Sequence, residues 1–184
     1  TMVRFAQEIG YSGSRELLSD LKEHIRHQIS SSRKTTVEAG SIEEAAQGAL
    51  ELSQQRLQRF SSTELPNLTR AAKILSQANH IWIVGEYMSY DMAAFLVKAF
   101  RLVGISSSLL HPDKGSLMSI SFQLQPEDVL LALSILDPGL ETSQAIRMAR
   151  EKEVKTIAIS GSSLSAPARE TDISVSVPVK NPAG

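Results

Sequence analysis

The chain of 184 residues contains no cysteine, which excludes a disulfide framework and a thiolate site. Aromatic residues make up only 5% of it. No apolar run approaches the roughly 18 residues that a membrane-spanning helix needs, and no signal peptide is recognisable. Hydrophobic residues reach 42%, enough for one sizeable core. We therefore expect a cytoplasmic protein with one main domain and a small appendage, without a membrane partner.

An excess of charge is also missing, since the net charge is −1 at pH 7. Residues 1–34 carry six Lys and Arg against four Asp and Glu, a net charge of +2, which leaves −3 for the remainder. This asymmetry is slight, but it has the direction expected for a small DNA-binding head. A charged, solvated helix face would give the same excess.

Two short helices and a linker are predicted at the N-terminus. Residues 1–10 have apolar residues at helical spacing and end at Gly10, a residue that often closes helices. Residues 14–29 place Leu and Ile at four-residue steps, and Ser14 can cap this helix. Residues 30–40 are polar and lack periodicity, which indicates a linker.

Two further helices are predicted, over about 41–60 and 63–78. Ser41 and Glu44 form a capping-box pattern, and Pro66 falls in the first turn of the second helix. Apolar residues at inner spacing are Ile42, Ala45, Ala46, Ala49 and Leu57 in the first helix and Leu68, Ala71, Ala72 and Leu75 in the second.

From residue 80 the pattern alternates between strands and helices. Strands are predicted over 80–85, 106–110, 128–134, 155–160 and 172–178, and helical segments over 89–103, 115–124, 139–151 and near 167–169. The helix over 89–103 is predicted to pack through Met92, Phe95, Leu96, Ala99 and Phe100. Such alternation predicts an α/β fold, a five-stranded parallel sheet with helices on both faces. Ligands of such sheets bind beyond the carboxyl ends of the strands, here the loops 85–90, 110–116, 134–142 and 160–166.

These elements resemble a sugar isomerase (SIS) domain over residues 65–178. The stretch from Ile81 to Gly104 resembles its opening unit, an apolar strand, a Gly-x-Gly-x-Ser turn and a long helix that ends in Gly. PEDVLLALS resembles the lead into its third strand, and residues 154–178 resemble its fourth and fifth strands. The resemblance implies a fold that usually binds sugar phosphates through a Ser-x-Ser-Gly-x-Thr turn.

Residues 4–29 resemble the end of the helix-turn-helix domain of RpiR-type regulators. Arg4-Phe5, Ile9-Gly10-Tyr11 and Gly13 carry this resemblance. It implies that residues 1–29 are the C-terminal part of a DNA-binding domain, 30–40 a linker and 41–184 an SIS-type effector-binding domain. We expect the chain to start at or within the recognition helix and to end before the last SIS helix. Thr1 and Arg4 match positions near DNA, where a contact to the phosphate backbone is expected.

The resemblance also implies a set of ligand-binding residues in the first and third loops. These are Gly85, Glu86, Ser89, Ser134, Asp137, Gly139 and Thr142. Other roles remain open for three of them. Ser89 is expected to cap the helix that follows, with or without ligand contact. Ser134 binds either a ligand or the backbone, and Asp137 belongs to an Asp-Pro-Gly sequence that is typical of a turn.

The third loop departs from the phosphate-binding pattern. Leu136, Asp137 and Gly139 stand where Ser, Gly and Thr are expected, and Tyr87 takes the place of the second glycine of the first loop. Leu136 offers no donor and Asp137 adds a negative charge, so we expect weak binding of simple sugar phosphates at this loop. The effector would be neutral, or its anion would lie near Ser89.

No residue pattern indicates catalysis, a cofactor or a metal. Glu86 is the one carboxylate of the first loop, and no second catalytic group stands beside it in the sequence. The histidines at 24, 27, 80 and 111 have no acidic partners at metal-binding spacing. The sequence thus favours a non-enzymatic, homo-oligomeric transcriptional regulator, dimeric or tetrameric, whose partners are promoter DNA and a sugar-derived effector. The alternative is an SIS-type sugar-phosphate isomerase or a pseudo-enzyme derived from one.

Overall fold

The structure is a computed structural model that describes residue 3, residues 13–15, 41–135 and 139–177. The chain divides into two compact units, Thr1–Gln58 and Arg59–Gly184. The predicted helices over 1–10 and 14–29 and the linker over 30–40 lie almost entirely outside the described residues, so they stay predictions.

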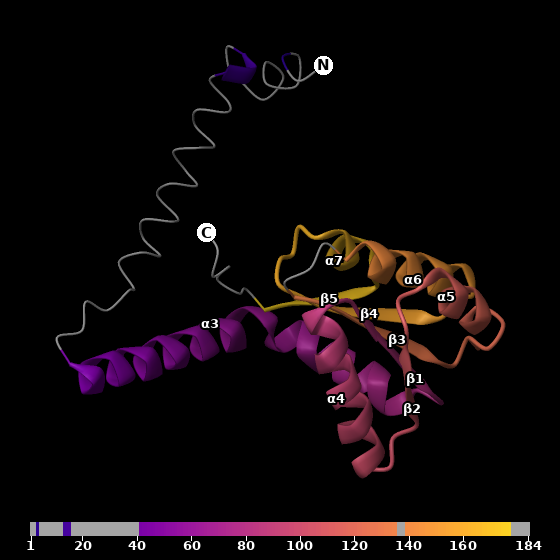
Figure 1. The fold of residues 1–184 in the computed structure, drawn as a ribbon, viewed down its shortest axis with the longest axis horizontal. Coiled ribbons are helices and arrows are strands. Elements are labelled where there is room, and N and C mark those ends of the chain that lie inside the picture. The colour runs from indigo at the N-terminus through magenta and orange to yellow at the C-terminus, as the bar shows by residue number, and fades with distance from the viewer. Residues whose placement is uncertain (1–2, 4–12, 16–40, 136–138, 178–184) are drawn as a thin grey trace. The chain divides into compact units, whose positions relative to one another are not determined.

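A five-stranded, all-parallel sheet forms the centre of the second unit (Figure 1). Its spatial order is β2-β1-β3-β4-β5. The strands are β1 (Ile81–Gly85), β2 (Ser107–Leu110), β3 (Val129–Ser134), β4 (Lys155–Ser160) and β5 (Ile173–Ser176). Every residue of β3 is buried, as expected for a central strand covered on both faces. The predicted α/β fold is confirmed.

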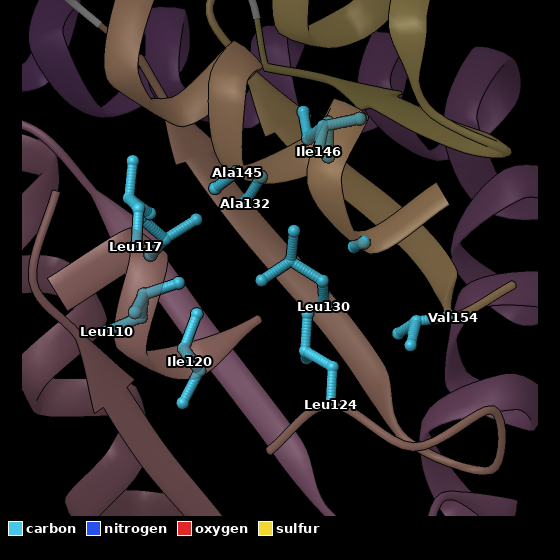
Figure 2. Packing of buried hydrophobic residues seen from close by; sticks show 12 residues of the cluster. Leu110, Leu117, Ile120, Leu124, Leu130, Ala132, Ala145, Ile146 and Val154 are labelled. Atoms are coloured by element: carbon cyan, nitrogen blue, oxygen red, sulfur yellow. The ribbon is translucent and has the colours of Figure 1, made fainter. Parts of the chain in front are cut away.

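Helices cover both faces of this sheet (Figure 1). On one face α5 (Lys114–Ile120) and α6 (Leu140–Glu151) pack on a cluster that includes Leu117, Leu130 and Ala145, shown in Figure 2, and α7 (Ala166–Glu170) lies beside α6. On the other face α4 (Met88–Leu102) and the end of α3 (Ile42–Gln77) cover a second cluster with Ile83 and Leu131.

The prediction of two helices before the sheet was wrong, because α3 is one helix of 36 residues. The hydroxyl groups of Ser62 and Thr63 donate to the Arg59 carbonyl oxygen, at 2.8 and 3.0 Å, and so bond within the helix instead of ending it. Pro66 is therefore an interior residue and not a first-turn residue.

Most of the apolar residues predicted to face inward from α3 are exposed. Ile42 and Leu57 are 85% and 68% exposed, the three alanines between them are exposed as well, and so are Leu68 and Ala72. Within the second unit Ala71 is buried, and Leu75 packs partly against the core. Helical spacing identified the apolar positions of α3, but it did not show which of them are buried by other residues of the same chain.

The inner face of α4 also differs from the prediction. Ala93 and Val97 are its buried apolar residues, and Leu96 and Phe100 pack partly against the same cluster. Met92 and Phe95 are 46% and 68% exposed. The helix carries two apolar stripes, and the one with Ala93 and Val97 packs on the sheet.

Candidate functional site

The chain reverses its direction of winding between β1 and β3. From β1 it passes to β2 on one side, and then returns to place β3 on the other side of β1. The loops after β1 and β3 lead to helices on opposite faces here, and the carboxyl ends of strands at such a reversal are the usual ligand position in parallel sheets. Gly85 pairs with Leu133 in register, and Ser134 pairs with Ser160. The two loops predicted from the sequence thus meet at this edge.

Gly85 allows the first turn of α4 to approach β1 closely. A Cβ atom at this position would lie 2.5 Å from the carbonyl oxygen of Ser89 and 2.7 Å from its carbonyl carbon. Both are backbone atoms, so any side chain would push α4 away from the strand.

Tyr87 adopts a backbone conformation that favours glycine, with φ 48° and ψ −120°. This is the position at which the sequence replaces the second glycine of the Gly-x-Gly-x-Ser pattern. A non-glycine residue held there costs on the order of 1–3 kcal/mol. The Tyr87 side chain is 77% exposed and lies at the start of α4.

The prediction that Ser89 caps α4 was wrong, because Tyr87 holds the cap position and Ser89 lies in the first turn. Ser89 is buried, and its hydroxyl oxygen accepts a hydrogen bond from the Ile135 N–H at 3.2 Å. Its own N–H donates to the Glu86 carbonyl oxygen at 2.9 Å. Ser89 therefore joins the two loops of the site.

Ser134 and Gly139 lie against each other where β3 leads toward α6. Gly139 has φ +66°, and a Cβ atom there would lie 2.7 Å from the Ser134 hydroxyl oxygen and 2.5 Å from Cγ of Pro167. The Ser134 side chain is buried. The backbone carbonyl oxygen of Ser134 accepts a hydrogen bond from the Gly161 N–H at 2.9 Å. Both a left-handed backbone and the lack of a side chain make glycine necessary at 139.

Glu86 reaches from the end of β1 to the amino end of α6. Its Oε1 accepts a hydrogen bond from the Thr142 N–H at 2.7 Å, and the residue is only 5% exposed. Burial raises the pKa of the Glu86 carboxyl group, the bond from the Thr142 amide lowers it, and a hydrogen bond with the Glu141 side chain raises it, with a net rise.

The Thr142 side chain is fully buried, and its hydroxyl oxygen has no hydrogen-bond partner within the described part of the chain. The Thr142 side chain also lowers the pKa of the Glu86 carboxyl group, against the larger effect of burial. A buried hydroxyl group without a partner is costly, and this one is closed off from solvent.

Six of the seven predicted ligand-binding residues thus lie at one edge of the sheet. Asp137 is outside the described residues, as are Leu136 and the predicted DNA contacts Thr1 and Arg4. Two features were not predicted. Glu141 places a second carboxyl group beside Glu86. The sequence gives no sign of this, because acids are common in the first turn of a helix. The Tyr90 hydroxyl lies 3.0 Å from Nδ1 of His111, at the end of β2.

No group of three metal-ligating side chains occurs in the part of the chain that the structure describes. No helix among these residues combines the length and the hydropathy that crossing a membrane requires.

A family model described as "SIS domain" matches residues 74–183. The chain belongs to the SIS domain family. A search of curated proteins found no match.

Solved SIS-type structures resemble the chain as well. The sugar isomerase domain of an RpiR transcription factor from Sphaerobacter thermophilus is 25% identical, with a TM-score of 0.65, over 72% of this chain and 75% of that one. The NanR protein of Vibrio vulnificus, complexed with ManNAc-6P, is 14% identical, with a TM-score of 0.64, over 97% of this chain and 62% of that one. The c3406 protein of Escherichia coli CFT073 is 19% identical, with a TM-score of 0.62, over 73% of this chain and 72% of that one. The last two likenesses concern the fold alone.

Proposed function

We propose that this chain is part of an RpiR-type transcriptional regulator whose SIS domain binds a sugar-derived effector. The observation that carries the proposal is the likeness to the sugar isomerase domain of an RpiR transcription factor over 72% of the chain. The Arg4-Phe5 and Ile9-Gly10-Tyr11 motifs support it, because they precede the SIS domain in the order expected for such a regulator.

The effector site is the edge formed by the ends of β1 and β3. It offers the Glu86 carboxyl group and the buried hydroxyl group of Thr142, with the Ser89 hydroxyl fixing the distance between the two loops. Carboxylate and hydroxyl groups are typical partners of sugar hydroxyls, since both form directional hydrogen bonds.

Self-association is proposed to use the α4 apolar stripe, which consists of Met88, Met92, Phe95, Ala99 and Leu102. These residues are spaced by four, three, four and three positions, the repeat that brings two helices together along one line of contact. All but the half-buried Ala99 are exposed in this chain. A second copy can present the same stripe around a two-fold axis, so a single surface suffices for a dimer.

Effector binding would then favour one of two arrangements of the dimer and alter the spacing of its DNA-binding heads. The test is a selection from random DNA with the full-length protein. We expect enrichment of a palindromic site, bound as a dimer with an affinity that falls steeply as salt rises. A selection that yields no preferred DNA sequence would refute the proposal that the protein is a transcriptional regulator.

One observation favours the alternative, a sugar-phosphate isomerase. A buried carboxyl group with a raised pKa, such as Glu86, can act as a general acid or base. We nevertheless expect no turnover of common aldose and ketose phosphates. Turnover that Glu86→Gln abolishes in a protein that still folds would establish the enzyme instead.

A further inference from the structure

Two opposite charges border the α4 apolar stripe on the same side. Asp91 stands one position before Met92, and Lys98 stands one position before Ala99. About two helical turns separate Asp91 from Lys98, so both follow one flank of the stripe. Both residues are exposed. Each charge therefore lies beside the surface through which the stripe is proposed to meet a second copy.

Neither charge is neutralised within the described part of the chain. Among the described residues, Asp91 and Lys98 take part in no ion pair. They cannot reach each other, because they are separated by a rise of about 10 Å along the helix axis. Both charges are therefore available to a partner that lies along α4.

The opposite flank of the stripe carries no charge. Ser89 and Leu96 stand there, one position after Met88 and Phe95. Ser89 is buried and Leu96 packs partly against the core, so this flank turns toward the sheet. The two flanks of the stripe thus differ, and a second copy must match the charged one.

The relative direction of two α4 helices decides which flanks meet. In a parallel pair each flank faces the opposite flank of the partner, so Asp91 and Lys98 would face Ser89 and Leu96 and find no opposite charge. In an antiparallel pair like flanks meet. Because Asp91 lies in the first half of the stripe and Lys98 in the second half, Asp91 of each copy then stands opposite Lys98 of the other.

We propose that two copies of this chain pair antiparallel along α4, about a two-fold axis that passes beside Phe95. Two ion pairs between Asp91 and Lys98 of opposite copies set the orientation and the register, because charge complementarity suppresses wrong arrangements. Phe95 lies near the centre of the contact, and Met88 of one copy comes close to Leu102 of the other. The inference rests on the proposed self-association through the α4 apolar stripe.

Charge reversal tests the ion pairs, with the dissociation constant of the dimer measured by sedimentation. Asp91→Lys and Lys98→Asp should each weaken the dimer at least about tenfold, because each turns two attractions into two repulsions. The double variant Asp91→Lys/Lys98→Asp exchanges the charges of both pairs, and its dissociation constant should return close to that of the wild type. Glu127→Lys makes the same change at an exposed acid outside α4 and should have no effect.

The double variant also separates the contact from a local effect on the helix. Asp91 lies in the first turn of α4, where an acid favours the helix dipole, so Asp91→Lys also disturbs the helix end. A change at position 98 does not repair that loss, but it repairs the contact between copies. Salt gives a second readout, because screening weakens attraction and repulsion alike. Higher salt should weaken the wild-type dimer and strengthen both single-variant dimers.

Cross-linking tests the orientation. The chain has no cysteine, so Met88→Cys and Leu102→Cys each introduce its one thiol. A short bismaleimide should join a mixture of the two variants. It should not join Met88→Cys to itself, because the two copies of residue 88 lie about 20 Å apart along the axis of an antiparallel pair.

Self-linking of Met88→Cys, or a double charge variant that dimerises no more tightly than the single variants, overturns the proposal. If the charge variants have no effect while Phe95→Glu still separates the copies, the orientation is wrong and self-association through the stripe stands. A wild-type chain that stays monomeric would refute the self-association itself. A lack of operator binding would refute the regulator and leave the antiparallel pairing intact.

Discussion

Replacing Gly85 by alanine should separate α4 from β1 and loosen the candidate site. The added Cβ atom would lie 2.5 Å from the Ser89 carbonyl oxygen, in a place where only backbone can move. Overpacking of this kind costs about 1–3 kcal/mol, which for a domain of this size lowers the melting temperature by about 3–10 °C. The shift should also weaken the bond from the Ile135 N–H to the Ser89 hydroxyl, so hydrogen exchange at the Ile135 amide should become faster.

Gly115→Ala is the matched control. Its Cβ atom would meet Oδ1 of Asp113 at 3.3 Å. This oxygen accepts the capping hydrogen bond from the Ser116 N–H, but a side-chain atom needs to give by only a few tenths of an ångström here. Alanine is also the better helix former inside α5 by up to about 1 kcal/mol. We therefore expect an unchanged or slightly raised melting temperature. A Gly85→Ala protein as stable as Gly115→Ala, with unchanged exchange at Ile135, would show that the close approach of α4 is not required.

Three further predictions concern the α4 apolar stripe, the Glu86 carboxyl group and the backbone of Tyr87. Phe95→Glu should turn the proposed dimer into a monomer in sedimentation analysis. The control is Phe122→Glu, which changes a phenylalanine beyond α5 that is 81% exposed and should leave the dimer intact. A dimer that survives Phe95→Glu would refute the proposal that the α4 apolar stripe forms the dimer contact. Because the folded-state pKa of Glu86 is raised, its neutral form favours folding below the ordinary value of 4.5, and this stability is lost as the pH rises through the raised pKa. The melting temperature of Glu86→Gln relative to wild type should thus increase with pH across that interval, and a difference independent of pH would contradict the raised pKa. Tyr87→Gly should not lower the melting temperature, although glycine usually costs about 0.5–1 kcal/mol, because it relieves the positive φ; a clear drop would show that the position is not strained.

The sheet could be predicted from the sequence because each strand is a short apolar run bounded by polar or glycine residues. The strand over 155–160 has the predicted bounds, and the buried run over 128–134 differs by one residue. Parallel order followed from the alternation of strands and helices, and with it the edge where Ser134 and Gly85 lie. These features depend on local pattern and on general rules of chain connection, so one sequence is sufficient.

The ends and the buried faces of the helices were harder to predict, because the sequence pattern allows two arrangements in each case. Ser62 and Thr63 can end a helix or bond within it, and only the whole structure decides. On α4 both Met92 and Val97 belong to apolar stripes at helical spacing, and packing against the sheet selects the one with Val97.

The contact between Glu86 and Thr142 could not be read from the sequence, since 56 positions separate the two residues. Each alone has an ordinary explanation, a polar loop residue and a first-turn hydroxyl. The pairing depends on the register of β1 with β3 and on the glycine at 139, whose left-handed backbone begins α6. The sequence identified the members of the site, and the packing of two loops determined what they do to one another.

The most direct test of an effector site at the ends of β1 and β3 is a nuclear magnetic resonance titration with a panel of hexoses, hexosamines and hexose phosphates. We predict that at least one carbohydrate shifts the amide resonances of both Ile135 and Thr142, which belong to the two joined loops, and leaves that of Glu127, at the opposite edge of the sheet, unchanged. A carbohydrate that binds but shifts Glu127 while leaving Ile135 and Thr142 unaffected, or a panel in which no compound binds, would contradict the proposed site.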